Sequence, residues 1–303
     1  MLVLLVGAGA FGAWTAWGGR RKVEQPRPIA AAPVEPKAIA PRNQSPALAP
    51  LIAVRRPLAH GPSLAGRAGI LVEAATGTVV WTKHPHLRLP IASTTKIMTA
   101  TLALDRLQPH TVVTIDPSVP RVAPFREGLR AGERIEAWKL FYGLLLYSGN
   151  DDALALAIAS AGSRPAFVKL MNAKAKELGL HDSHFRSPSG VIDADNYSSA
   201  WDMAALARYA MRNPRFRAVV RTRVKRVPWA APTYGKVYVN KNHLIGAYPG
   251  ADGIKTGWTT KASHCLIASA TRHGIRLIAV VLGSPDSYAD AKRLLDYGFS
   301  TRG

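Results

Sequence analysis

A serine and a lysine three residues apart, Ser93 and Lys96, open a stretch that could carry out nucleophilic chemistry. Residues three apart lie on one face of a helix, so the hydroxyl and the amine can meet there. The residues that follow, 97–104, are almost all apolar. Because burial favours the neutral amine, Lys96 could act as a base beside a nucleophilic hydroxyl. For a single match, however, a serine that caps a core helix beside an exposed lysine is the better explanation.

Two further short motifs carry polar side chains that could face the same cleft. Ser148-Gly149-Asn150 follows an apolar run and precedes two aspartates, which is typical of a loop between two helices. Lys255-Thr256-Gly257 is expected at the end of a short strand, where the glycine would let a substrate backbone lie against the strand. Each motif also has a purely structural explanation, the first as a helix stop and cap, the second as an ordinary strand with an exposed lysine.

The joint pattern of the three motifs changes this interpretation. Ser148 follows Ser93 by 55 residues and Lys255 follows Asn150 by 105, and S-x-x-K, S-x-N and K-T-G in this order are the motif set of penicillin-recognising serine acyltransferases. Over about residues 63–300 the chain therefore resembles the low-molecular-mass D-alanyl-D-alanine carboxypeptidases, the penicillin-binding serine DD-peptidases. The same resemblance is visible in three further stretches: Asn172–Leu180, Ser187–Gly190 and Leu277–Gly283.

The resemblance implies a serine-type carboxypeptidase that removes the terminal D-alanine from peptidoglycan stem peptides and is inhibited by β-lactam antibiotics. Ser93 would attack the carbonyl between the last two D-alanines and form an acyl-enzyme, with Lys96 as the general base. Ser148 would relay a proton to the departing amine, and Asn150 would orient Lys96 and the acyl chain. Water would then release the acyl group, whereas an amine acceptor would make the protein a transpeptidase.

The third motif would bind the substrate. Two lysines in one cleft disfavour each other's charge, so Lys96 is expected to be neutral while Lys255 stays cationic. Lys255 and Thr256 would then hold the terminal carboxylate, beside Gly257. By resemblance, the backbone N–H groups of Ser93 and Trp258 would hold the oxyanion, a kind of donor that typically contributes about 3 kcal/mol. No cofactor and no metal are implied.

Apolar patterning predicts strands near both ends of the folded region and helices between them. Strands are expected at residues 68–74, 78–82, 219–227, 236–240, 253–256, 265–270 and 275–283, and helices from Ser93 onward and at 135–147, 151–161, 164–178, 200–211 and 287–297. This order predicts an α/β (α+β) protein in which one antiparallel sheet, built from both ends, is flanked by helices and carries an inserted all-helical lobe. The resemblance implies the β-lactamase/transpeptidase-like fold.

The 303-residue chain is strongly basic, with 40 Lys and Arg against 19 Asp and Glu, a net charge of +21. Residues 1–62 hold 8 basic and 2 acidic residues, so the remainder still carries +15. Such a surface attracts anionic lipids, anionic cell-wall polymers or nucleic acid. No zinc-finger spacing and no aromatic-basic RNA signature occurs, so a nucleic-acid partner is not predicted. The single cysteine, Cys265, excludes an internal disulfide and is expected in the core.

Composition divides the chain into three segments. Residues 1–22 are expected to form an N-terminal hydrophobic signal or anchor, because an apolar run ends in Arg20-Arg21-Lys22 without a cleavage site at once. The positive-inside rule opposes this anchor unless the native start lies upstream. Residues 23–62 are a Pro/Ala-rich extended linker, and 63–303 are the serine DD-peptidase catalytic domain. We therefore expect an extracytoplasmic protein of the cell envelope, in the periplasm or on the outer face of the membrane, tethered through its N-terminus.

Two other functions remain open. A class A-like β-lactamase shares the motifs but needs a deacylating glutamate, for which Glu177 is the nearest candidate. A non-catalytic protein that binds cell wall or polyanions would suit the charge and the linker. The stretches 191–197 and 261–265 depart from the family pattern, which leaves substrate preference open. The chain also ends after the closing helix, without the additional β domain of many relatives, so any membrane attachment is expected at the N-terminus.

Overall fold

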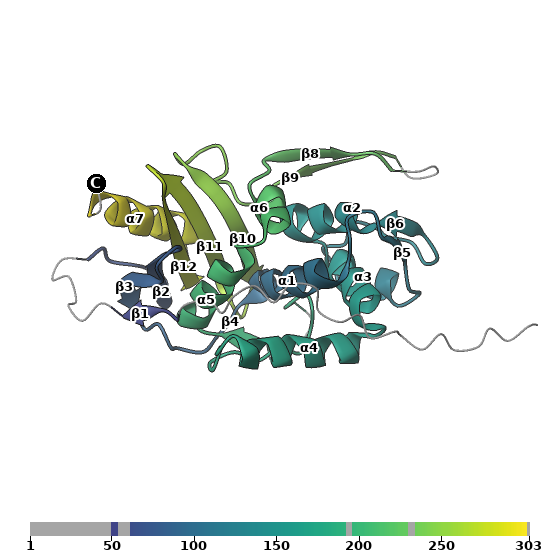
Figure 1. The fold of residues 1–303 in the computed structure, drawn as a ribbon, viewed down its shortest axis with the longest axis horizontal. Coiled ribbons are helices and arrows are strands. Elements are labelled where there is room, and N and C mark those ends of the chain that lie inside the picture. Colours follow the sequence, from purple (N-terminus) through teal and green to yellow (C-terminus); the bar gives the residue numbers. More distant parts are fainter. Residues whose placement is uncertain (1–49, 54–60, 192–195, 230–233, 302–303) are drawn as a thin grey trace, which may run out of the picture. The chain divides into compact units, whose positions relative to one another are not determined.

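The computed structural model describes residues 50–53, 61–191, 196–229 and 234–301, all of which belong to one compact unit, residues 36–303. The predicted signal or anchor segment, 1–22, and most of the predicted linker, 23–62, lie outside the described residues. Figure 1 shows a twisted sheet with a helix on its outer face and a group of helices on the other side.

The main sheet joins strands from both ends of the described chain, in the order β1-β3-β2-β12-β11-β10. Its neighbours pair antiparallel except β1, which runs parallel to β3. The strands are β1 (Ile52–Ala53), β2 (Ala68–Glu73), β3 (Thr78–Lys83), β10 (Ala251–Thr259), β11 (Ser263–Arg272) and β12 (Ile275–Ser284). The prediction of one sheet built from both ends is confirmed. The two residues of β1 belong to the stretch predicted as linker and lie against this sheet.

Helices cover both faces of the sheet, as the apolar patterns predict. The closing helix α7 (Ser287–Ser300) packs on β11 and β12, and α5 (Ala200–Ala210) packs on β2 and β12 from the other side. The helical lobe consists of α2 (Ala137–Tyr142), α3 (Asn150–Ala161) and α4 (Arg164–Glu177) around α1 (Lys96–Arg106). An inserted helical lobe is thus present, between β3 and β10.

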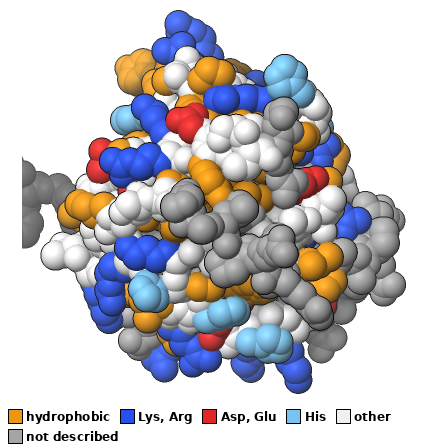
Figure 2. All heavy atoms as spheres, turned by 90° about the vertical axis from the view of Figure 1, so that its left-hand side faces the viewer, with side chains coloured by type: hydrophobic (Ala, Val, Ile, Leu, Met, Phe, Trp, Pro, Cys, Tyr) orange, Lys and Arg blue, Asp and Glu red, His pale blue; other side chains and the backbone are white. Residues whose placement is uncertain are grey.

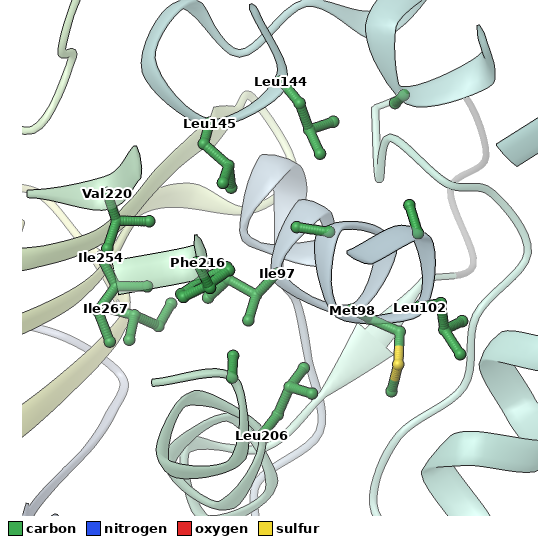
Figure 3. Close-up of a cluster of buried hydrophobic side chains, with 14 of the residues drawn as sticks. Ile97, Met98, Leu102, Leu144, Leu145, Leu206, Phe216, Val220, Ile254 and Ile267 are labelled. Atoms are coloured by element: carbon green, nitrogen blue, oxygen red, sulfur yellow. The ribbon is translucent and has the colours of Figure 1, made fainter. Parts of the chain in front are cut away.

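Helix α1 is the centre of the larger hydrophobic core. Its residues Ile97, Met98 and Leu102 are at most 1% exposed. Figure 3 shows their side chains among residues from the lobe, from α5 and α6, and from strands β10 and β11. The labelled neighbours are Leu144, Leu145, Leu206, Phe216, Val220, Ile254 and Ile267. Because α1 packs among the lobe, α5, α6 and one face of the sheet, the residues at its start are held firmly against both the sheet and the lobe.

Three short strand pairs complete the fold outside the main sheet. They are β4 (Leu89–Pro90) with β7 (Tyr197–Ser198), β5 (Val112–Thr114) with β6 (Arg134–Glu136), and β8 (Val224–Val227) with β9 (Lys236–Val239). Short turns of helix also occur, at η1 (Ala92–Thr95) and η2 (Val119–Arg121), together with a π-helical turn η3 (Gly143–Tyr147). In the described ranges no single helix is long and apolar enough to cross a membrane; only α3 and α4 taken together, bent by 85°, meet that length and composition.

Three predicted elements differ from the structure. The helix expected at 135–147 begins with strand β6 and ends in the π-helical turn, so only its middle is α-helical. The strand expected at 219–227 is first a helix, α6 (Pro214–Val220), and only then strand β8. Asn213 caps that helix and Pro214 occupies its first position, a combination that starts helices and outweighs the β-branched residues that follow. The strand expected at 253–256 extends over nine residues as β10.

The basic composition is visible on the surface. On the face shown in Figure 2, Lys and Arg side chains lie around the rim, and Asp and Glu side chains are few. The net charge of +21 therefore belongs in part to the exterior of the described unit. A field of this sign attracts anions over distances of about a Debye length.

Candidate active site

Ser93 and Lys96 meet as their spacing predicts. Ser93 lies within the turn η1, which leads directly into α1, and Lys96 is the first residue of that helix. The Lys96 Nζ lies 2.9 Å from the Ser93 Oγ, and the lysine side chain is fully buried. Neither η1 nor α1 has a side-chain cap, so the explanation of Ser93 as a capping residue does not hold. Ala92, immediately before Ser93, adopts a left-handed backbone with φ of 46°, a strained conformation often found at functional sites.

The buried Lys96 ammonium or amine lies among oxygen atoms from three parts of the chain. Besides Ser93, the Nζ lies 2.8 Å from the Asn150 Oδ1 and donates to the backbone carbonyl of Ser189 at 3.2 Å. Burial, and then the nearby charge of Lys255, lowers the pKa of Lys96 well below its usual value, against an opposing effect of Asp152. A lowered pKa favours the neutral amine, which is the form of lysine that can accept a proton from a hydroxyl.

Ser148 and Asn150 join the π-helical turn η3 to helix α3. Ser148 has a left-handed backbone, with φ of 73° and ψ of 35°, and its side chain lines the same cleft as Ser93. Asn150 does not cap α3; its Oδ1 faces Lys96 and its Nδ2 donates to the backbone carbonyl of Pro124 at 2.7 Å. Gly149 is required between them, because a Cβ there would lie 2.0 Å from a carboxylate oxygen of Asp152.

The K-T-G motif lies in the middle of β10, not at a strand end, because the strand continues to Thr259. Lys255 is 1% exposed, and its Nζ donates to the backbone carbonyl of Thr256 at 3.0 Å. A Cβ on Gly257 would come within 3.1 Å of the backbone nitrogen of Ser93, so only glycine lets β10 approach the turn η1 this closely.

Lys255, which the sequence predicts to stay cationic, is almost fully buried in the free protein, with 1% of its surface exposed. Burial, followed by the charge of Lys241, lowers the pKa of Lys255 to about 7. At neutral pH the free protein therefore holds this side chain in both protonation states. A carboxylate bound beside the Lys255 Nζ would favour the charged form and raise that pKa.

One cleft connects these groups. It has a volume of about 300 Å³ and is lined by Ser93, Phe125, Ser148, Val191, Lys241, His243, Thr256, Gly257, Trp258, His264, Cys265, Ser287 and Tyr288. Five of the eight residues predicted for the site line it directly. The other three, Lys96, Asn150 and Lys255, are at most 1% exposed and lie behind that lining. Cys265 is buried, as expected.

Lys241 is a cleft residue that the motifs did not indicate. It follows β9 by two residues, and its Nζ lies 4.7 Å from the ring centre of Tyr147 and 5.2 Å from that of Phe125. Its positive charge contributes to the lowered pKa of both Lys96 and Lys255. Three lysines thus converge on a cleft whose lining contains no Asp or Glu among the described residues. Only the excess of basic residues in that part of the sequence could have indicated it.

Two alternative chemistries find no support in the described residues. No group of three His, Cys, Asp or Glu side chains is arranged to hold a metal ion there. Glu177, the candidate deacylating glutamate of a β-lactamase, ends helix α4, where it is 61% exposed and paired with Lys174 at 2.7 Å. It does not line the cleft.

Comparisons with known proteins agree with this geometry. Residues 56–286 match the family described as D-alanyl-D-alanine carboxypeptidase. The chain belongs to this family. The resemblance drawn from the three motifs is thereby confirmed.

Two curated relatives and one solved structure illustrate the similarity. The D-alanyl-D-alanine carboxypeptidase DacF of Bacillus subtilis is 35% identical over 77% of this chain, which spans 62% of the relative's length. The D-alanyl-D-alanine carboxypeptidase of Streptomyces sp. strain K15 is 37% identical over 79% of this chain and 89% of its own. The crystal structure of the Streptomyces K15 DD-transpeptidase superposes with a TM-score of 0.74 at 33% identity, covering 80% of this chain and 99% of that one. The expected fold class is confirmed by this likeness.

Proposed function

We propose that this protein is a serine-type D-alanyl-D-alanine carboxypeptidase, which cleaves the terminal D-alanine from peptidoglycan stem peptides and is acylated by penicillins. The observation that carries the proposal is the buried Lys96 Nζ, which lies within 2.9 Å of both the Ser93 Oγ and the Asn150 Oδ1. A lysine with a lowered pKa beside a serine at the edge of a cleft forms a base and a nucleophile. Membership of the family supports the same activity.

In the proposed acylation step, the Ser93 Oγ attacks the carbonyl carbon between the last two D-alanines while Lys96 accepts the hydroxyl proton. The C–N bond then breaks, and the departing amine takes up a proton delivered through Ser148. The backbone N–H groups of Ser93 and Trp258 hold the oxyanion meanwhile. The close approach of Gly257 to the Ser93 backbone nitrogen supports this arrangement, because it brings β10 beside the nucleophile.

In the second step, water attacks the acyl-serine ester, and the proton of that water returns the Ser93 hydroxyl. The net reaction consumes one water and yields the shortened peptide and free D-alanine. We propose that Lys255 and Thr256 hold the terminal carboxylate, with Lys241 adding a second positive charge in the cleft. The similarity to a protein called a DD-transpeptidase makes an amine acceptor the natural competitor of water.

We propose further that the protein works outside the cytoplasm, where its substrate is found, and that residues 1–22 attach it to the membrane. The apolar run over residues 2–17 supports this attachment. Fractionation of cells that express the full chain tests it. Recovery of the unprocessed chain wholly in the soluble fraction would refute the anchor.

The decisive experiment for the enzymatic function is intact-mass measurement after incubation with a penicillin. We expect a stable adduct, one penicillin per chain, on the native protein and none on Ser93→Ala. Penicillin that disappears without an accumulated adduct would indicate a β-lactamase instead. If the penicillin stays intact and no adduct forms, the protein is a non-catalytic cell-wall or polyanion binder.

A further inference from the structure

The positive charge of the chain is concentrated around strands β8 and β9. The forty residues from Arg212 to Ala251 contain nine Lys and Arg and no Asp or Glu, which is a large part of the net charge of +21. Of these basic residues, Arg221, Arg223 and Arg226 are exposed. Figure 1 shows β8–β9 as a separate two-stranded ribbon beside α2 and α6. Such a concentration of one sign indicates an anionic partner.

One face of this ribbon packs on the protein. Lys225 pairs with Tyr238, and the Lys225 Nζ lies 5.1 Å from the ring centre of Tyr142 on α2. The next pair is Val227 with Lys236, and Val227 is 1% exposed. The Lys236 Nζ lies 3.2 Å from a carboxylate oxygen of Glu127. The side chains on this face therefore contact other parts of the protein.

The opposite face of the ribbon is apolar and uncovered. Val224 pairs with Val239, and Arg226 pairs with Val237, so these four side chains point to the same side. The three valines are 49%, 59% and 51% exposed, in the order Val224, Val239 and Val237. The solvent-facing side of an antiparallel ribbon normally carries polar residues. Three exposed valines around an arginine are therefore unusual.

We propose that this outer face of β8–β9, with Val224, Arg226, Val237 and Val239, docks on the surface of an anionic phospholipid membrane. Exposed arginines would lie at the headgroups while the valines enter the boundary with the acyl chains. The charge is complementary, since each basic residue near an anionic bilayer contributes about fivefold in partitioning, the equivalent of about 1 kcal/mol. The inference is independent of the proposed enzymatic activity.

A membrane explains the composition of this surface better than a soluble polyanion does. An anionic cell-wall polymer would use the arginines but would gain nothing from the exposed valines. Tyr234, just before β9, is 89% exposed and adds an amphipathic ring of the kind found at membrane interfaces. The docked ribbon would also fix the height of the cleft above the bilayer, because Lys241 follows β9 by only two residues and lines that cleft.

The test uses the full chain with an environment-sensitive fluorophore on the outer face. Because Cys265 is buried, the label reacts with an introduced cysteine at Val237→Cys. The matched control carries the same label at Lys292→Cys, an exposed position on α7, far from the ribbon. Both proteins are mixed with vesicles of phosphatidylcholine containing about one third phosphatidylglycerol, and with vesicles of phosphatidylcholine alone, at matched protein and lipid concentrations.

We expect a blue shift of the label at position 237 with the anionic vesicles only, and none at position 292. The shift should be lost in the triple variant Arg221→Gln, Arg223→Gln, Arg226→Gln, and in about 1 M salt, where the Debye length is only about 3 Å. The proposal is overturned if the chain floats with the vesicles while position 237 stays aqueous. It is equally overturned if a soluble polyanion, or a second copy of the chain without lipid, produces the same shift.

Discussion

At the scale of single residues, the proposed chemistry depends on one buried lysine. The Lys96 Nζ has three oxygen neighbours and a strongly lowered pKa, because burial and the nearby Lys255 both disfavour its charge. The carboxylate of Asp152 opposes this shift only in part. A neutral amine in this position can take the Ser93 proton without an additional histidine or glutamate.

We therefore predict that Lys96→Met slows acylation by penicillin by a factor of about 10² to 10⁴, the usual contribution of a general base. The methionine retains much of the buried volume, so the variant should still fold. The rate is followed by intact mass over time, with thermal unfolding as the check on folding. Lys292→Met, at an exposed position on α7, is the matched control. An acylation rate for Lys96→Met within tenfold of the native rate would exclude Lys96 as the base.

The two lysines also predict a bell-shaped pH dependence of kcat/KM for peptide cleavage. Lys96 must lose a proton to act as a base, so the rate rises with pH on the acidic side. Lys255 must keep its proton to hold the terminal carboxylate, and its pKa of about 7 in the free protein places the midpoint of the falling side near pH 7. A peptide ending in D-alanine amide lacks the carboxylate and should lose the falling side. The same falling side with both peptides would mean that Lys255 does not bind the carboxylate.

At the scale of elements, the start of helix α3 holds the loop that borders the cleft. The carboxylate of Asp151, which is fully buried, accepts hydrogen bonds from the backbone N–H groups of Glu127, Gly128 and Leu129 at 3.0, 2.9 and 3.1 Å. Asn150, one residue earlier, binds the same loop, since its backbone N–H donates to the carbonyl of Phe125 at 2.9 Å. Asp151 therefore supports this loop, and the loop in turn fixes Asn150, the residue that contacts Lys96.

Asp151→Ala should lower the free energy of unfolding by about 3 kcal/mol, because three backbone N–H groups lose a charged, fully buried acceptor. It should also slow acylation, since the loop that binds Asn150 is released. Asp151→Asn keeps one acceptor oxygen and should recover part of both losses. Urea unfolding and the acylation rate measure the two effects. Glu177→Ala, at an exposed ion pair, should cost less than about 1 kcal/mol. Normal acylation in a destabilised Asp151→Ala would show that the loop does not position the site.

Elements with a strong local pattern were predictable from the sequence, and the reasons for the errors are local too. Long amphipathic runs gave α3, α4, α5 and α7 within a few residues of their bounds. The stretch at 219–227 was misread because its β-branched residues drew more weight than Asn213-Pro214, which begin helix α6. The K-T-G motif was placed at a strand end because the predicted strand stopped at Thr256, whereas β10 continues to Thr259.

Other features had no local signal. The strand pairs β4–β7 and β5–β6 are two or three residues long and depend on contacts between distant segments. Lys241 belongs to no recognised motif, and only the fold brings its charge close to Lys96 and Lys255. The depressed pKa of Lys255 was missed because burial of a strand residue inside a cleft is a tertiary property. The three motifs therefore indicated the site residues that lie within them. They could not indicate residues outside them, such as Lys241, that complete the cleft.

At the scale of the whole molecule, the catalytic unit is closed by its two ends. The strands β2 and β12 pair along six residues, and helix α7 covers them. The carboxylate of Asp290 on α7 accepts from the backbone N–H groups of Ala65 and Gly66 at 3.0 and 2.8 Å, which ties the start of the unit to its end. Helix α1 packs on the sheet as well as on the lobe. Loss of the contacts between the two ends should therefore disturb the sheet and, through it, the position of the site residues at the start of α1.

A tight contact in this closure is made by Gly298, where α7 lies directly on the sheet. A Cβ there would come within 2.6 Å of Leu71 on β2 and of Leu277 on β12. We predict that Gly298→Val lowers the free energy of unfolding by about 1 to 3 kcal/mol, because overpacking outweighs the better helix propensity of a larger residue. Ser300→Val, at an exposed position on the same helix, is the control and should change stability little. Thermal unfolding measures both, and the folded fraction of Gly298→Val should still form the Ser93 adduct, since η1 and β10 are untouched. Equal stability of the two variants would show that the helix can shift on the sheet, and that the two ends do not close the unit as tightly as this contact implies.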